Sequence, residues 1–335
     1  MRKLLAVRRR GRIKLKSRSV VQVQFRSRIG KQVIKEYPVR DLDAILLIGS
    51  NIYIESSAVS VLSSMNIPVA VVAKDSIGIL MNPVVVVSSH RRSLQYRAKR
   101  VDGLEIALEY IKAKIWGLQN VLKYRGVPPP SVPSPPAKVE DPEIYESEIR
   151  IWESTASHRL WQSLITLIDP DRLEALQSIY GFSGRKPRHP DPFNKALSVM
   201  YAVLYSLATK ALIAAGLDPT YGFLHRTRYS TPLTFDYTEM FKPIAVDATI
   251  TLINTQGLPQ LGNDGELTRE WVNKAIKHLY DHLTLRHKDT GKTPYQQIFL
   301  KAFCLARHLE GRCRRDRITI TWNRRQYRRK RQAHH

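Results

Sequence analysis

The segment from residue 215 to 241 brings together side chains that could bind a divalent metal ion. It reads AGLDPTYGFLHRTRYSTPLTFDYTEMF and contains His225, followed by Asp236 and Glu239. Asp236 and Glu239 are three residues apart, so they would share one face of a helix. One imidazole with two or three carboxylates suits Mg²⁺ or Mn²⁺ acting on phosphate esters.

Each of these residues also has a simpler interpretation. An Asp at the N-cap of a helix with a Glu at position N3 is typical of a capping box, which would account for Asp236 and Glu239. A single histidine in a glycine-containing stretch such as that around His225 is more often a surface polar group than a ligand. The residues of this segment alone leave both alternatives open.

A further carboxylate, Glu153, interrupts the apolar face of a predicted helix. The spacing places it on one face with four apolar residues, Ile149, Ala156, Leu160 and Leu164. An unpaired buried charge is costly, so Glu153 must reach the edge of that face, pair with a cation or coordinate a metal. From this helix alone, a salt bridge or an edge position is the favoured interpretation.

Two other groupings could bind zinc, but neither has a recognised motif. His278 and His282 lie one helical turn apart in HLYDH, without the glutamate that follows the first histidine in the zincin motif. Cys304, His308 and Cys313 have a spacing that matches no zinc ribbon. We therefore expect no zinc site at either place.

The charge balance predicts a polyanionic partner. The 335 residues include 54 Lys and Arg against 29 Asp and Glu, which gives a formal net charge of +25. Such an excess binds nucleic acid through phosphate contacts and counterion release. The apolar runs AILLIG, IPVAVVA and PVVVV are too short to span a bilayer, and no signal-peptide hydrophobic region follows the basic start. We expect a cytoplasmic protein, and its two cysteines indicate no disulfide framework.

The basic residues are concentrated at both ends of the chain. Residues 1–31 contain no acidic side chain, and the basic tail 312–335 interleaves arginines with Trp322 and Tyr327. This mixture suits phosphates and stacked bases. The alternative for the tail is a solvated or disordered segment.

The apolar periodicity predicts an α+β fold with a small β-rich domain followed by a larger helical domain. In residues 1–88, the runs SVVQVQF, AILLIGS and IPVAVVA predict strands, and IESSAVSVLSSMN predicts one helix. Residues 89–335 have the helical period, beginning with one long helix that ends at Gly126. The proline-rich insertion 127–136 predicts an extended surface connection. Further helices are predicted at 141–168, 194–216, 268–285 and 294–311.

Several separated motifs resemble the CRISPR-associated endonuclease and integrase of the spacer-acquisition module. DPFNKALSVMYAVLYSLATKALIAAGLDPTYGFLH and LTFDYTEMFKPIAVD follow the family pattern almost continuously. IRIWESTASHRLW resembles the helix that carries its first acidic ligand, and KAKIWGLQNVL resembles its first long helix. ILLIGSNIYIESSAVSVLSSMNIPVAVV resembles its N-terminal β domain, so the resemblance covers most of residues 20 to 312.

This resemblance implies metal ligands and catalytic residues. Glu153, His225 and Glu239 would bind Mg²⁺ or Mn²⁺, and Asp236 would support or share the ion. Lys242 stands where the family commonly has an arginine, which keeps the charge but loses the bidentate fork. We expect nucleic-acid contacts from three cations in this region, Arg226, Arg228 and Lys242.

The resemblance also implies an activity and partners. The expected activity is insertion of short DNA fragments into a CRISPR array by attack of a 3′-hydroxyl on a phosphodiester, with hydrolysis when water attacks. The expected partners are double-stranded DNA, CRISPR repeat DNA, a second copy bound through the β domain, and a small CRISPR adaptation protein. The alternative is a non-catalytic, basic nucleic-acid-binding scaffold, which explains the termini but not the acidic residues.

Overall fold

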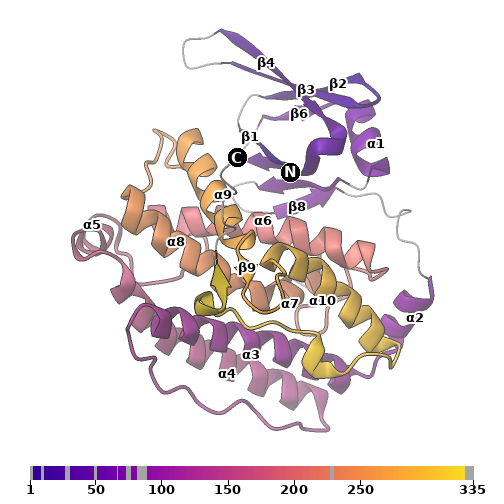
Figure 1. Cartoon of the computed structure of the whole chain (residues 1–335), viewed down its shortest axis with the longest axis vertical. Helices are drawn as coiled ribbons and strands as arrows, with labels where there is room; N and C mark the ends of the chain where they lie inside the picture. Colours follow the sequence, from indigo (N-terminus) through magenta and orange to yellow (C-terminus); the bar gives the residue numbers. More distant parts are fainter. Residues whose placement is uncertain are drawn as a thin grey trace.

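The structure is a computed structural model, and it places a β-rich N-terminal part on one side of a larger helical part (Figure 1). This arrangement confirms the predicted α+β fold class. The described residues are 3–8, 11–26, 31–48, 51–65, 67–72, 77–80, 89–226 and 230–328.

The N-terminal part contains two four-stranded sheets. The first has the order β1 (Lys3–Arg8), β5 (Leu42–Ile48), β7 (Val69–Val72) and β8 (Ile77–Leu80), with β1, β5 and β7 parallel and β8 antiparallel. The second has the order β4 (Gln32–Pro38), β3 (Val20–Arg26), β2 (Arg12–Ser17) and β6 (Tyr53–Ile54). The predicted helix is α1 (Ser56–Ser64), and a 3₁₀ turn, η1 (Val39–Asp41), precedes β5.

Strand β5 lies between two cores. All of its residues are buried, which explains why its sequence is an uninterrupted apolar run. Ile45 and Leu47 pack in the core of the β-rich part, whereas Leu46 and Ile48 pack in the helical core. The β-rich part is therefore joined to the helical part by a shared apolar layer.

The helical part consists of consecutive helices, and the last four of them, α7 to α10, pack against one long apolar helix, α6 (Pro192–Ala214). By length and composition α6 is apolar enough to cross a membrane, but 89% of its most apolar window is buried inside the protein, as in a core helix. The other helices are α2 (Ser89–Arg97), α3 (Arg100–Tyr124), α4 (Pro142–Leu164), α5 (Pro170–Tyr180), α7 (Pro232–Thr238), α8 (Lys242–Gln256), α9 (Arg269–Leu283) and α10 (Pro294–Leu309).

The long helix predicted to end at Gly126 is in fact two helices. The helix is interrupted at residues 98 and 99, which connect α2 to α3. The predicted stop is confirmed, because Gly126 has a φ of 83°, a conformation that glycine adopts at little cost. The prediction of a single helix was wrong. The sequence gives no signal for the interruption, because neither proline nor glycine occurs at or directly beside residues 98 and 99.

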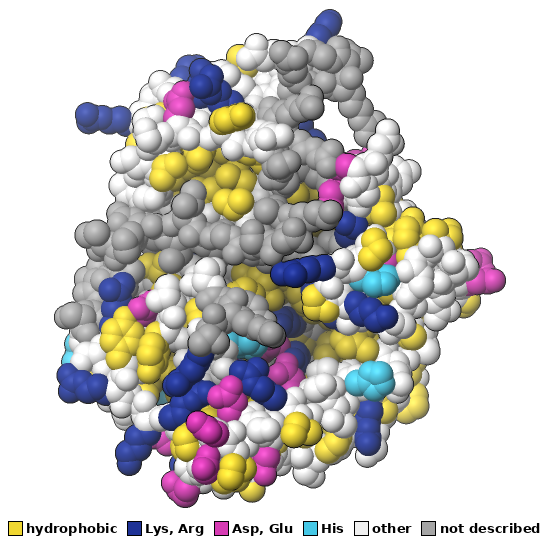
Figure 2. All heavy atoms as spheres, turned by 180° about the vertical axis from the view of Figure 1, so that it is seen from behind, with side chains coloured by type: hydrophobic (Ala, Val, Ile, Leu, Met, Phe, Trp, Pro, Cys, Tyr) yellow, Lys and Arg dark blue, Asp and Glu magenta, His cyan; other side chains and the backbone are white. Residues whose placement is uncertain are grey.

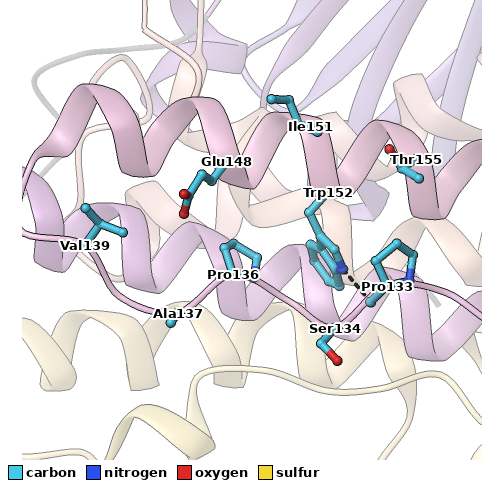
Figure 3. Close-up of a pocket in the computed structure, with 9 residues that line it drawn as sticks. All are labelled: Pro133, Ser134, Pro136, Ala137, Val139, Glu148, Ile151, Trp152 and Thr155. Carbon is cyan, nitrogen blue, oxygen red and sulfur yellow. Dashed lines mark hydrogen bonds between the residues drawn. The ribbon is translucent and has the colours of Figure 1, made fainter.

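The proline-rich connection runs along α4 without helix or strand, as the prolines predicted (Figure 3). The Trp152 indole donates a hydrogen bond of 2.8 Å to the carbonyl of Pro133, and Arg159 donates one of 3.0 Å to the carbonyl of Ser131. A shallow groove of about 520 Å³ lies between this connection and α4, and Glu148 and Trp152 are among its lining residues.

The basic C-terminal segment is folded onto the helices, at least to residue 328. Trp322 is fully buried and donates a hydrogen bond of 3.2 Å to Asp247, and Tyr327 stacks on it with ring centres 4.9 Å apart. The prediction that these two rings are suited to stacking on bases was therefore wrong. Residues 329–335, with His334 and His335, lie outside the described residues.

Candidate metal-dependent active site

Five elements carry the predicted site residues. Glu153 lies on α4, His225 in the connection before α7, and Asp236 on α7. Glu239 begins the 3₁₀ turn η4 (Glu239–Phe241), and Lys242 begins α8. Helix α3 packs against α4, α7 and η4, so it forms one side of this region.

Asp236 organises the backbone around His225. Its carboxylate accepts hydrogen bonds from the amides of Phe223 (2.6 Å), Leu224 (3.0 Å) and His225 (3.1 Å). The same carboxylate lies 2.6 Å from Nδ1 of His225. Since Nδ1 is engaged by Asp236, Nε2 is the nitrogen that His225 would present to a metal.

Asp236 does not cap a helix, so the capping-box interpretation was wrong. Helix α7 begins at Pro232, with Thr231 as its N-cap, and Asp236 lies within the helix. Pro232 accounts for the earlier start, because proline is well suited to the first turn of a helix. The carboxylate of Asp236 instead accepts hydrogen bonds from backbone amide groups of the connection that precedes α7.

Glu239 is a buried carboxylate flanked by two lysines. Its side chain is 3% exposed, its Oε1 accepts a hydrogen bond from Lys242, and its Oε2 lies 2.9 Å from Nζ of Lys114. Despite that short distance, Oε2 accepts no hydrogen bond of normal geometry from the described residues. Burial would raise the pKa of Glu239, but the ammonium groups of Lys114 and Lys242 lower it to about 2.

Glu153, on a different helix, contacts the same lysine. It lies on the apolar face that the spacing predicted, where Ile149 and Ala156 are fully buried, while its own side chain is 23% exposed. Its Oε1 accepts a hydrogen bond from Nζ of Lys114. Glu153 and Glu239 therefore share one ammonium group.

The donor set fits a divalent cation, although its present geometry is that of ion pairs. Among the described residues, no three His, Cys, Asp or Glu side chains converge closely enough to hold a metal. However, Glu153 and Glu239 already converge on one cationic group, and Oε2 of Glu239 is a buried oxygen without a normal hydrogen bond. Two carboxylates and an imidazole are ligands that Mg²⁺ or Mn²⁺ accepts.

Three residues that the sequence analysis missed support the connection carrying His225. Arg150 donates a hydrogen bond of 2.8 Å to the carbonyl of Leu224 and pairs with Glu146 at 2.7 Å. Arg100 donates to the same Glu146 and to the carbonyl of Phe223. This network holds the carbonyl groups of the connection, whereas Asp236 holds its amide groups.

Lys114 was also missed, although a signal was present. It lies three residues after Ile111 and four before Leu118, which are both buried, so its spacing places it on the apolar face of α3. This is the same pattern that singled out Glu153 on α4. Pairing the two interrupted faces would have predicted their contact.

The three predicted nucleic-acid contacts have different surroundings. Arg226 is exposed, whereas Lys242 is mostly buried, pairs with Glu239 and lies 5.5 Å from the centre of the Tyr201 ring. Arg228 lies outside the described residues. On the face drawn in Figure 2, Lys and Arg side chains are mixed with Asp and Glu side chains in the lower part of the molecule.

The histidines of the two groupings considered for zinc make contacts within the protein. Nδ1 of His282 donates to the carbonyl of His278 at 2.9 Å, and its Nε2 lies 3.7 Å from Asp247. Nδ1 of His308 donates to the carbonyl of Cys313 at 2.7 Å.

The fold and the site define a strongly basic α+β protein whose helical part holds two carboxylates, Glu153 and Glu239, on one lysine and a histidine, His225, paired with a buried aspartate. The profile of the family described as CRISPR associated protein Cas1 matches residues 5–283, and the chain belongs to this family. The resemblance inferred from the sequence motifs is thereby confirmed.

Curated relatives carry the same family name. The chain is 37% identical over 172 residues to the CRISPR-associated endonuclease Cas1 of Hyperthermus butylicus, which covers 47% of this chain and 49% of that protein. It is 30% identical over 232 residues to the CRISPR-associated endonuclease Cas1 2 of Pyrobaculum aerophilum, which covers 66% of this chain and 74% of that protein. The match thus spans about half of the first relative and three quarters of the second.

Solved structures share the fold over nearly the whole chain. A casposase bound to integration product matches with a TM-score of 0.74 and 20% identity, covering 97% of this chain and 94% of the casposase. A CAS1 protein from Thermotoga maritima matches with a TM-score of 0.72 and 19% identity, covering 92% and 97%. At this identity the likeness establishes the fold.

Proposed function

We propose that this protein is a metal-dependent DNA endonuclease and integrase that inserts short foreign DNA fragments into a CRISPR array. The observation that carries the proposal is that Glu153 and Glu239 converge on one cation in the helical part of a protein with a charge of +25. Membership of the Cas1 family and the endonuclease names of the relatives support this role in CRISPR adaptation.

The proposed site assigns a task to each residue. Glu153, Glu239 and Nε2 of His225 would hold Mg²⁺ or Mn²⁺, which when bound supplies polarisation of the phosphate and neutralisation of developing charge. Asp236 keeps the proton on Nδ1 of His225 and so directs Nε2 away from itself. Lys242 adds a fixed positive charge beside Glu239.

The same site serves two reactions, depending on the nucleophile. Attack by a 3′-hydroxyl of a DNA fragment exchanges one phosphodiester for another, and attack by water hydrolyses the phosphodiester. The net charge would attract the DNA, and the proposed contacts are Arg226, Arg228 and Lys242, which lie close in sequence to His225 and Glu239.

The proposed assembly is a homodimer through the β-rich part, bridged by a small CRISPR adaptation protein in the cytoplasm. The β-rich part exposes large apolar side chains that a partner could cover, Ile34, Tyr53 and Met65. Related folds occur in a Cas6-RT-Cas1–Cas2 complex (TM-score 0.67) and in a TtCas1-DNA complex (TM-score 0.57). These complexes motivate the proposed partners.

A strand-transfer assay tests the proposal. A labelled DNA fragment is incubated with the protein and a plasmid that carries a CRISPR repeat, with Mg²⁺, with Mn²⁺, and with a chelator. The proposal predicts labelled plasmid only when a divalent ion is present. A scaffold without catalytic activity would bind the DNA under all three conditions and yield no joined product.

A further inference from the structure

Lys114 is a cationic side chain in the middle of an apolar helix face. Its side chain is 9% exposed, and the residues on either side of it along that face, Ile111 and Leu118, are buried. Its Nζ contacts Glu153 on α4 and Glu239 on η4, and so joins three elements that meet at the proposed site. Both carboxylates belong to the proposed ligand set.

We propose that Lys114 is the resident counter-ion of the metal site, so that it neutralises Glu153 and Glu239 without metal and competes with a divalent cation for them. This inference rests on the proposed function, because it takes these two carboxylates as metal ligands. It adds a residue that tunes the affinity of the site for the ion.

The charges of the cluster support this role. Glu239 is almost fully buried, and a buried carboxylate is costly unless a cation compensates it. Lys242 pairs with Oε1 of Glu239, whereas Lys114 pairs with Oε2 of Glu239 and with Glu153. A divalent ion bound to the same two oxygens would repel the nearby ammonium, so Lys114 must yield its contacts to the ion.

Two opposite effects follow from removing this ammonium. Without metal, Lys114→Met leaves Glu153 and Glu239 without their shared cation, so the melting temperature should fall. With metal, the ion no longer competes with an ammonium, so it should bind at least about tenfold more tightly than in the wild type. Methionine keeps an unbranched apolar chain of similar length on the buried face of α3.

A matched control is available on the same helix. Lys112 lies two residues away and is also partly buried, but its Nζ pairs with Glu109 at 2.9 Å, within α3. Lys112→Met removes the same charge from the same element without touching the proposed ligands. It should therefore have the metal affinity of the wild type.

The experiment uses Mn²⁺ alone, without DNA, on the full-length chain. Free Mn²⁺ is titrated by electron paramagnetic resonance, and melting temperatures are recorded with and without Mn²⁺. We expect tighter Mn²⁺ binding and a larger Mn²⁺-induced rise in melting temperature for Lys114→Met than for the wild type or Lys112→Met. Equal or weaker binding by folded Lys114→Met would overturn the inference.

Two further outcomes are also decisive. If Lys114→Met does not fold without metal, the double variant with Glu153→Gln should fold, since it removes one of the uncompensated charges. Failure of that double variant to fold would show that Lys114 is needed for packing and would overturn the inference. If neither the folded wild type nor folded Lys114→Met binds Mn²⁺, the proposed metal site itself is wrong, and the inference falls with it.

Discussion

At the scale of single residues, the site is a balance of opposite charges held in a largely buried region. Glu239 is compensated by Lys114 and Lys242, while Asp236 is satisfied by three backbone amides and the imidazole of His225. The two carboxylates therefore have different roles despite their proximity in the chain. Asp236 holds the connection in place, and Glu239 remains available to a cation.

The low pKa of Glu239 makes a prediction about stability in acid. Its folded-state pKa of about 2 lies below the ordinary value of 4.5, so its ion pairs stabilise the protein above pH 4.5. This contribution is lost as the pH falls from 4.5 towards 2. Between pH 5 and pH 3, the wild type should lose about 2 kcal/mol more unfolding free energy than Glu239→Gln.

Urea unfolding in metal-free buffer at a series of pH values measures this difference. Glu148→Gln is a suitable control, because Glu148 is exposed on α4 beside the proline-rich connection (Figure 3). It should follow the wild type. Parallel pH profiles for the wild type and Glu239→Gln would show that the ion pairs of Glu239 contribute no such stability.

At the scale of elements, the C-terminal segment is part of the helical core. Asn120 on α3 donates a hydrogen bond of 2.9 Å to the carbonyl of Trp322, and the β-carbon of Trp322 lies next to Gly117 of the same helix. A β-carbon at Gly117 would lie 2.7 Å from Pro243, so the packing of α8 against α3 favours a glycine at this position. The segment from Ile318 to Tyr327 thereby covers the end of α3.

This packing changes the expected effect of truncation. Removing residues 312–335 deletes the buried Ile318 and Trp322, so it should unfold or strongly destabilise the protein; Trp322→Ala alone should cost about 3 to 5 kcal/mol. Removing only residues 329–335 spares those core residues but removes three basic side chains. That shorter truncation should keep the melting temperature and flatten the dependence of log DNA affinity on log salt.

Melting curves and DNA-binding titrations at several salt concentrations check both truncations. An unchanged salt dependence after removal of residues 329–335 would show that these charges do not contact phosphates. A stable, fully folded protein without residues 312–335 would contradict the packing of Trp322.

The elements also show what could be predicted from the sequence. Helical periodicity identified the face of α4 that carries Glu153, and apolar runs identified β5 and β7, because these patterns directly reflect burial. Strand β2 alternates Ile13 and Leu15 with basic residues, but its high charge obscured the alternation. Residue types and nearness in the chain suggested His225 with Asp236 and Glu239, whereas the ligand set of Glu153, His225 and Glu239 came from family resemblance and stays a prediction.

Trp322 was misjudged and Lys114 was missed for a common reason. A tryptophan among arginines is typical of a nucleic-acid-binding segment, and a lysine in a helix is typical of a surface. In both cases the decisive factor is a contact made by residues far apart in sequence, Trp322 with Asp247 and Lys114 with Glu239. Such contacts leave only a weak trace in the local pattern.

At the scale of the whole molecule, the β-rich and helical parts share an apolar layer. Lys210 on α6 donates a hydrogen bond of 3.2 Å to the carbonyl of Asp43 on β5, next to the packing of Leu46 and Ile48 against the helices. Deleting residues 1–88 would expose that layer. Surface substitutions are therefore a cleaner test of the proposed dimer than the deletion.

Substitutions on the β-rich part should dissociate the proposed dimer. Ile34 is 50% exposed and Tyr53 is 67% exposed, so Ile34→Glu and Tyr53→Glu should place a charge in the interface and yield monomers in sedimentation. Ile179→Glu is the control, because Ile179 is equally exposed but lies on α5. Dimers that persist in both β-rich variants would place the interface elsewhere.

The most direct test of the proposed active site compares strand transfer by variants of the proposed ligands with strand transfer by a matched glutamate variant outside the site. Glu153→Ala and Glu148→Ala each remove one glutamate from α4, but only Glu153 contacts Lys114 at the proposed site. With Mn²⁺ and a repeat-containing plasmid, Glu153→Ala should lose at least about 100-fold in joined product, as should Glu239→Ala and His225→Ala. Glu148→Ala should match the wild type, and all four should bind DNA without metal. Folded Glu153→Ala, His225→Ala and Glu239→Ala that join DNA at the wild-type rate would contradict the proposed active site.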